Sequence, residues 1–240
     1  MLDLVVSLLP LALGIVMSPL AIMALVAVLL SDRARQNGVS YFAGWTLAII
    51  AVVAVSLVLF TLAGIEDRSE PPVWTYGVRL LLGVLLALAA VVVYRRGRAR
   101  VLAMAEAVTP SDVVEAAPQL PGWLHAVASF TPGRSAVLGF GIFALNPVDL
   151  SCAVLAGLDI HLAALSAPAT ATVSVAFVVV GAAPIAIPVF LVLAKGERAT
   201  PVLTRLRGWI ASHSTQLNAA LLLFIAIVQL QKAISGLIGS

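Results

Sequence analysis

The sequence GIVMSP occupies residues 14–19, inside the first long apolar stretch of the chain, and GIFALNP occupies residues 141–147, inside the fourth. A proline within a helix donates no backbone hydrogen bond, and its ring crowds the carbonyl four residues earlier, so each helix is expected to kink or break. In a membrane, the freed backbone groups must find partners in protein or in a water-lined cavity. Corresponding breaks in two halves of a chain are typical of transporters that bind their substrate at the breaks. The two motifs therefore predict a substrate path between two related halves.

The composition is that of an integral membrane protein. Of the 240 residues, 62% are hydrophobic and 10% are charged, and the mean hydropathy is +1.11, whereas soluble domains carry about 25% charged residues. A hydrocarbon core about 30 Å thick needs about 20 apolar residues per helix. The predicted fold class is all-α with six transmembrane helices, in which Pro184 and Pro188 are capable of bending the fifth helix or ending it early. The six stretches are residues 4–30, 39–64, 73–94, 135–160, 167–194 and 215–238.

The basic residues predict how the chain crosses the membrane. Eleven of the fourteen Lys and Arg fall in the first, third and fifth loops between the predicted spans. Positive charge favours the cytoplasmic side of the inner (plasma) membrane, where we expect the protein to lie. These loops are therefore predicted to face the cytoplasm, and both termini are predicted to lie outside it. The first span lacks a positively charged leading region, so we expect it to be retained as a helix. The eleven residues are Arg33, Arg35, Arg95, Arg96, Arg98, Arg100, Arg134, Lys195, Arg198, Arg205 and Arg207.

This topology divides the chain into two inverted repeats of three helices. Residues 1–94 form the first repeat, residues 95–134 a cytoplasmic linker loop, and residues 135–240 the second repeat. The first helix of each repeat is the one broken at proline, and the two run in opposite directions. Substrate sites of inverted repeats lie near the midplane where the repeats meet. The sequence pI of about 9.5 does not indicate a nucleic-acid partner, because the charge is divided among three short loops.

Five residues at the two breaks are the candidates for a substrate or ion pathway: Ser18, Pro19, Asn146, Pro147 and Asp149. Asp149 lies near the middle of the fourth span, where an ionisable group is costly unless it faces a partner or a cavity. It is a candidate proton carrier, a counter-charge for a cationic substrate, or a structural acceptor for backbone N–H groups at the break. Ser18 and Asn146 precede the two prolines and can bind loosened backbone or a polar group of a ligand.

The first loop carries a second candidate contact. Arg33 and Arg35 are suited to anionic lipid headgroups because guanidinium groups pair well with such oxygens, although they also serve topology alone. Asn37 is grouped with them, in a predicted turn that ends in Asn37-Gly38.

Five glycines in the apolar stretches are expected to let helices pack closely, as small residues do in membranes. They are Gly14, Gly44, Gly139, Gly141 and Gly157.

Several kinds of chemistry are not indicated. Asp159 and His161 are too few to predict a metal site, and the single cysteine, Cys152, excludes an internal disulfide. No hydrolase elbow, phosphate-binding loop or nucleotide fingerprint occurs. We therefore expect neither an enzyme nor a cofactor, and the energy for transport would come from a gradient or from a partner ATPase.

The order of short motifs along the chain resembles one family, the actinobacterial glycolipid-addressing proteins, also called sulfolipid-addressing or peptidoglycolipid-addressing proteins. The similar segments are MSPLAI at 17–22, LLSDRARQNG at 29–38, FAGW at 42–45, PGW at 121–123, PGR at 132–134 and LNP at 145–147. The family is similar to a branch of the lysine-exporter superfamily, whose members have about six helices in two repeats and often dimerise. The resemblance implies movement of a cell-envelope glycolipid, or a precursor, across the inner membrane.

One position departs from the family pattern. The family commonly follows Asn-Pro with Lys and Asn, whereas this chain has Val148 and Asp149. Asp149 is therefore not carried over as a family residue, and the charge of the substrate or of a coupling ion is expected to differ here.

The sequence thus favours an exporter or flippase of an envelope lipid or glycolipid. Two alternatives stay open: an exporter of small solutes such as amino acids or cations, and a non-transporting scaffold for lipid synthesis or export machinery. The expected partners are the lipid itself, a second copy in a homodimer, and an envelope-lipid synthase or a large exporter.

Overall fold

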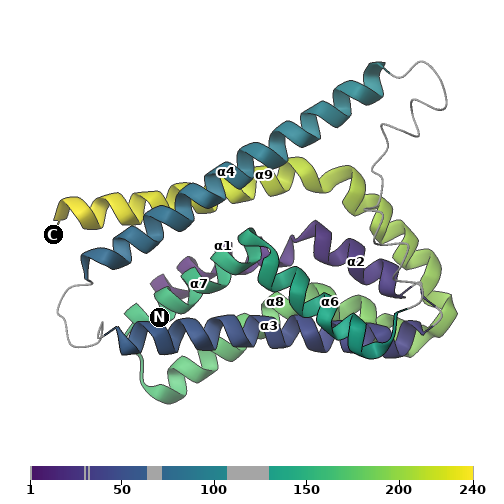
Figure 1. The fold of residues 1–240 in the computed structure, drawn as a ribbon, viewed down its shortest axis with the longest axis horizontal. Coiled ribbons are helices and arrows are strands. Elements are labelled where there is room, and N and C mark those ends of the chain that lie inside the picture. Colours follow the sequence, from purple (N-terminus) through teal and green to yellow (C-terminus); the bar gives the residue numbers. More distant parts are fainter. Residues whose placement is uncertain (1, 30, 32, 64–71, 107–129, 240) are drawn as a thin grey trace.

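The computed structural model of the protein describes residues 2–29, 31, 33–63, 72–106 and 130–239, and every regular element in these ranges is helical (Figure 1). Four helices are long and apolar enough to cross a membrane, or six if each of two bent helix pairs is one span. The predicted all-α membrane fold is confirmed at this level. The elements are α1 (Leu2–Val16), α2 (Pro19–Leu29), α3 (Ala34–Leu62), α4 (Val73–Glu106), α6 (Pro132–Leu145), α7 (Pro147–Leu162), α8 (Ala167–Lys195), η2 (Gly196–Ala199) and α9 (Thr200–Gly239).

The same order of elements occurs twice along the chain. A bent pair comes first: α1 and α2 meet at 47°, and α6 and α7 meet at 72°. A single helix of 29 residues follows in each half, α3 and α8. A longer helix ends each half, α4 with 34 residues and α9 with 40. The two halves therefore match in the kind, order and approximate length of their helices.

The second break has a clear local cause. Asn146 has extended backbone angles, φ −81° and ψ 111°, which end α6 and begin α7. A residue before proline is pushed away from the helical region, and proline at the first position of a helix needs no hydrogen-bond partner. The Asn146 side-chain oxygen accepts a hydrogen bond of 3.1 Å from the Val148 N–H, which caps the new helix.

The two bent pairs run antiparallel and cross at their breaks. In Figure 1, α1 and α2 lead from the side of the N-terminus toward the opposite side, and α6 and α7 lead back. Consequently α1 packs against α7, and α2 packs against α6. Around them, α3 packs along α6, α7 and α8, and α4 runs beside α9. This arrangement brings the two proline breaks to the same depth in the molecule.

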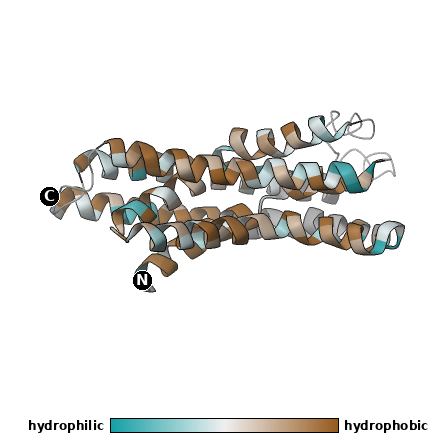
Figure 2. Cartoon of the chain, turned by 90° about the horizontal axis from the view of Figure 1, so that it is seen from below, coloured by the Kyte–Doolittle hydropathy of each residue, from teal (hydrophilic) through white to brown (hydrophobic). Residues whose placement is uncertain are grey.

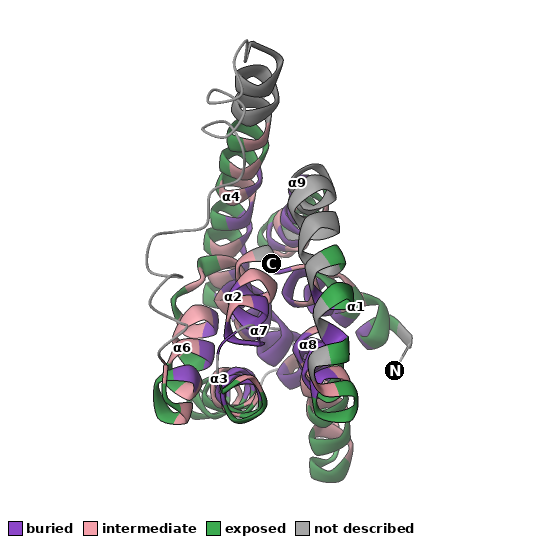
Figure 3. Cartoon of the chain, turned by 90° about the vertical axis from the view of Figure 1, so that its right-hand side faces the viewer, coloured by how far each residue is buried: buried purple, intermediate pink, exposed green. Residues whose placement is uncertain are grey.

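The centre of the molecule is α7. Eleven of its sixteen residues are buried, and Figure 3 shows this helix enclosed by its neighbours. On the outer surface, large apolar side chains are exposed, such as Leu62 at 79% and Leu145 at 84%. Figure 2 shows apolar residues along most of the length of the helices. Apolar side chains facing outward suit contact with lipid.

Glycines allow α3 and α6 to touch through their backbones. A Cβ at Gly44 would overlap the carbonyl oxygen of Ala136, and a Cβ at Gly139 would overlap that of Tyr41. The expectation of close packing holds at these two positions, as it does at Gly14 and Gly157. It is wrong at Gly141, where a Cβ would meet nothing within 4 Å.

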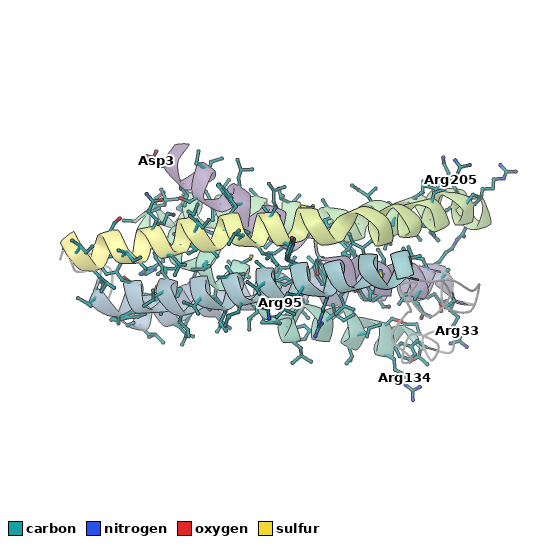
Figure 4. All side chains as sticks on the ribbon, turned by 90° about the horizontal axis from the view of Figure 1, so that it is seen from above. Asp3, Arg33, Arg95, Arg134 and Arg205 are labelled. Atoms are coloured by element: carbon teal, nitrogen blue, oxygen red, sulfur yellow. The ribbon has the colours of Figure 1, made fainter. Side chains whose placement is uncertain are left out.

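Basic residues gather at one end of the molecule, where the first, third and fifth connections lie. Figure 4 shows Arg33, Arg134 and Arg205 at that end and Asp3 at the other. Arg95 lies part of the way along α4 instead of in a loop. The predicted third span ends at residue 94, close to the end of the candidate membrane span at Gly97, although α4 itself continues to Glu106. Arginine favours helix and its long side chain can reach away from an apolar surface, so a helix can continue past the membrane.

Three further predictions concern helix boundaries. The turn ending in Asn37-Gly38 is wrong, because α3 begins at Ala34 and contains both residues. The last helix begins at Thr200, before the predicted span of residues 215–238, and its candidate membrane span is Ala219–Ile238. Pro184 and Pro188 lie inside α8 without ending it. The part of the predicted linker at 107–129 lies outside the described residues.

Candidate functional site

Three polar side chains from the two breaks meet in the interior. The Ser18 hydroxyl donates a hydrogen bond of 2.9 Å to Asp149 Oδ2. Asn146 Nδ2 donates to the same carboxylate oxygen at 2.7 Å and lies 3.4 Å from Ser18 Oγ. The structure thus brings together three of the five residues chosen from the sequence at the breaks, and we call these three the break cluster.

Two of the three residues of the break cluster are buried, whereas Asn146 is partly exposed. Asp149 is fully buried and Ser18 is 4% exposed. The second carboxylate oxygen, Asp149 Oδ1, is buried and has no hydrogen-bond partner in the described part of the chain. No Lys or Arg of that part forms an ion pair with Asp149. The carboxyl group is therefore held by neutral donors through one oxygen only.

The break cluster also lies at the N-termini of two half-helices. Asp149 is in the first turn of α7, and the Ser18 carbonyl accepts the first hydrogen bond of α2, from the Ile22 N–H at 3.3 Å. Helix N-termini carry partial positive charge and favour anions. The remaining two candidates, Pro19 and Pro147, are the first residues of α2 and α7. They set where the half-helices begin.

The first-loop candidates lie elsewhere. Arg33 and Arg35 are exposed, and Arg33 lies at the basic end of the molecule. Asn37 is fully buried, and its Nδ2 donates to Ser31 Oγ at 3.1 Å and to the Phe130 carbonyl at 2.9 Å. Asn37 therefore joins α3 to the residues before α6, and the structure separates it from the two exposed arginines.

A second polar cluster was not selected from the sequence. Arg79 Nη2 lies 2.6 Å from Asp159 Oδ1, and Lys232 Nζ lies 3.4 Å from Asp159 Oδ2. Arg79 and Lys232 are two of the three basic residues that the positive-inside pattern leaves unassigned. Charged groups inside membrane spans pair with one another. Two basic residues outside the basic loops therefore indicate an acidic partner inside the protein.

The break cluster is suited to binding rather than to covalent chemistry. It offers a hydroxyl, an amide and a carboxyl group between the ends of half-helices, in an apolar surround. Hydroxyl, amide and carboxyl groups are able to bind a polar headgroup, a cation or a proton.

Comparison with known proteins identifies the family. A family model described as Sap, sulfolipid-1-addressing protein, matches residues 8–235, which include both breaks and all the helices described above except the extreme ends. No curated protein and no solved structure matches the chain. The chain belongs to the Sap, sulfolipid-1-addressing protein, family.

Proposed function

We propose that this protein is an inner-membrane exporter or flippase that moves an envelope lipid or glycolipid along the break cluster. The observation that carries the proposal is the contact between Ser18 and Asp149. These two residues are 131 positions apart in the chain, and their contact joins the two proline breaks inside an apolar membrane protein. Family membership supports a role in sulfolipid addressing or export.

Two inverted three-helix repeats are part of this proposal. The repeated order of bent pair, 29-residue helix and long helix supports them. If α1, α2 and α3 correspond to α6, α7 and α8, the contacts between the halves are also symmetric. The contact of α1 with α7 corresponds to that of α6 with α2, and the contact of α3 with α7 corresponds to that of α8 with α2. In such folds, one repeat moves against the other around a site at their junction.

Transport would then proceed by separation of the two bent pairs. The closed arrangement holds Ser18, Asn146 and Asp149 against one another. When α1 and α2 move away from α6 and α7, these three side chains become free to bind a headgroup, while the acyl chains stay in the surrounding lipid. The basic end would face the cytoplasm, where Arg33, Arg134 and Arg205 meet anionic headgroups before entry.

Asp149 would couple the cycle to an ion gradient. Its unpartnered oxygen can take a proton or a cation when the site opens. We expect the energy to come from such a gradient or from a partner protein.

One observation favours a second candidate, an exporter of small cationic solutes. Asp149 lacks a basic partner among the described residues, so a solute cation could fill that role. An uptake assay in inverted proteoliposomes with radiolabelled lysine and arginine separates the two: saturable uptake of the amino acids supports the second candidate.

The test of the main proposal is lipid movement by the purified protein. Reconstitution into liposomes with fluorescent phospholipid and glycolipid analogues, followed by quenching of the outer leaflet, measures transfer between leaflets. We expect faster transfer than in protein-free liposomes, and retention of a lipid precursor inside cells that lack the gene. An unchanged surface lipid profile in such cells, together with no transfer in liposomes, would contradict the proposal and leave the scaffold role.

A further inference from the structure

A mixed-charge cluster joins four helices at the end of the molecule opposite the basic loops. Arg79 lies near the start of α4, Asp159 near the end of α7, and Lys232 near the end of α9. These helix ends lie on the side of the molecule where both termini are found (Figure 1). Ser7 of α1 completes the cluster, because its hydroxyl oxygen accepts a hydrogen bond of 3.0 Å from Lys232 Nζ.

The cluster carries more positive than negative charge. Two cations share one carboxylate, and the other partner of Arg79 is neutral, the Gln229 side-chain oxygen at 2.9 Å. In the part of the chain that the structure describes, no second carboxylate lies within ion-pair distance of Arg79 or Lys232. One unit of positive charge is therefore left without a counter-ion among the described residues.

The three charged groups differ in how firmly they are held. The side chains of Arg79 and Asp159 are 7% and 4% exposed, and they are 2.6 Å apart. The Lys232 side chain is 34% exposed and lies 3.4 Å from the same carboxylate. Lys232 is thus the accessible cation, and its weak contact with Asp159 can be exchanged for another anion without breaking the Arg79 pair.

We propose that Lys232, with Arg79 and Gln229 behind it, forms an exit site for the anionic headgroup of the exported lipid, a sulfate, phosphate or carboxylate group. Asp159 closes the site when no headgroup is present. The inference rests on the proposed lipid transport for its class of ligand. Lys232 belongs to the second half of the chain and Ser7 to the first, so a headgroup that draws Lys232 away from Ser7 loosens a contact between the halves at the outer end.

The test is the binding of two glycolipids that differ by one sulfate, sulfatide and galactosylceramide, to the purified full-length chain by native mass spectrometry. A charge-assisted hydrogen bond supports about a tenfold preference for sulfatide in the unmodified protein. Lys232→Gln keeps the Arg79 pair with Asp159 and should remove most of this preference, and Lys232→Arg should restore it. Lys232→Met, which keeps the apolar stem, replaces Lys232→Gln if that variant does not accumulate.

The matched control is the double variant Arg95→Gln with Arg96→Gln, which removes two exposed cations that lie farther along α4 than Arg79. It should bind both glycolipids as the unmodified protein does. An unchanged sulfatide preference in both Lys232→Gln and Lys232→Met, or its loss in the double arginine variant, would overturn the inferred site.

These outcomes are separable from the proposed function. A preference for sulfatide that depends on Lys232, without lipid transfer in liposomes, supports the exit site and contradicts transport. Lipid transfer without any such preference supports transport and overturns the exit site.

Discussion

The Ser18 hydroxyl donates a hydrogen bond of 2.9 Å to the Asp149 carboxylate, although 131 positions separate the two residues in the chain. Each residue lies close to a proline that starts a half-helix, Pro19 in α2 and Pro147 in α7. The contact therefore joins the two interrupted spans at their breaks. A polar contact at this place is costly in lipid unless it is fully partnered or used in function.

Replacing Asp149 with Asn should separate function from folding. The carbonyl oxygen of the introduced amide can still accept the hydrogen bonds that Ser18 and Asn146 donate, so the folded protein should accumulate at the usual level. The negative charge and the exchangeable proton are lost, and we expect transport in liposomes to fall at least about tenfold, as for the loss of a hydrogen bond to a charged group.

The measurement is initial transfer rate per folded protein, with Ser151→Ala as a control on the same helix. Ser151 is buried in α7 but lies outside the break cluster. Normal membrane levels of Asp149→Asn with normal transport would remove Asp149 from the mechanism and leave it as a structural acceptor.

Adding a methyl group at Gly44 or Gly139 should destabilise the protein. The new Cβ would overlap the Ala136 carbonyl oxygen in the first case and that of Tyr41 in the second. Since the obstacle is backbone, α3 and α6 must move apart, and overpacking of this kind costs about 1–3 kcal/mol or more.

Thermal unfolding of the detergent-solubilised protein measures this effect. Gly141→Ala is the matched control, because its Cβ meets nothing within 4 Å, and alanine is favoured over glycine in a helix by about 1 kcal/mol. Equal unfolding temperatures for Gly44→Ala and Gly141→Ala would contradict the close approach of α3 and α6.

Asn37 should matter for stability and the neighbouring arginines should not. Asn37→Ala removes a buried donor to the Phe130 carbonyl and to Ser31 Oγ, which costs about 1–3 kcal/mol when an acceptor is left without a partner. Arg33 and Arg35 are exposed, so their replacement by Gln should shift the unfolding temperature little. A larger loss of stability from either arginine than from Asn37 would be inconsistent with the structure.

Features set by local chemistry could be predicted from the sequence. Pro19 and Pro147 begin new half-helices, as expected for a residue that disfavours continuation of the helix before it. The residue type alone does not decide the outcome, because Pro184 and Pro188 lie inside α8 without ending it. The meeting of Ser18 with Asp149 could be anticipated as well, because two spans of opposite direction with breaks at equal depth bring those breaks together.

Contacts that depend on how each helix is rotated about its axis could not be predicted from the sequence. An almost uniformly apolar helix does not reveal which face meets which neighbour, so the pairing of Arg79 with Asp159 and Lys232 cannot be predicted from hydropathy. Hydropathy also does not predict where a helix ends, because it marks only where the chain leaves the membrane. The helix α4 continues past that point, through its arginines, to Glu106. The sequence predicts a turn at Asn37 because Asn-Gly favours turns, but burial against Phe130 keeps this residue in α3.

The central claim is that the break cluster opens during transport, and cysteine labelling tests it most directly. Cys152→Ala removes the single native thiol, and Ser18→Cys then places one thiol in the break cluster, where Ser18 is 4% exposed. Ser56→Cys is the matched control, since Ser56 is similarly buried at 5% but lies away from the breaks, beside Gly157.

The measurement is the rate of maleimide labelling in membrane vesicles that are transporting lipid, compared with vesicles at rest. We expect the thiol at position 18 to be labelled faster during transport, with loss of activity as labelling proceeds, and the thiol at position 56 to stay unlabelled. A thiol at position 18 that remains unlabelled while lipid transfer continues would contradict a substrate path through the two breaks.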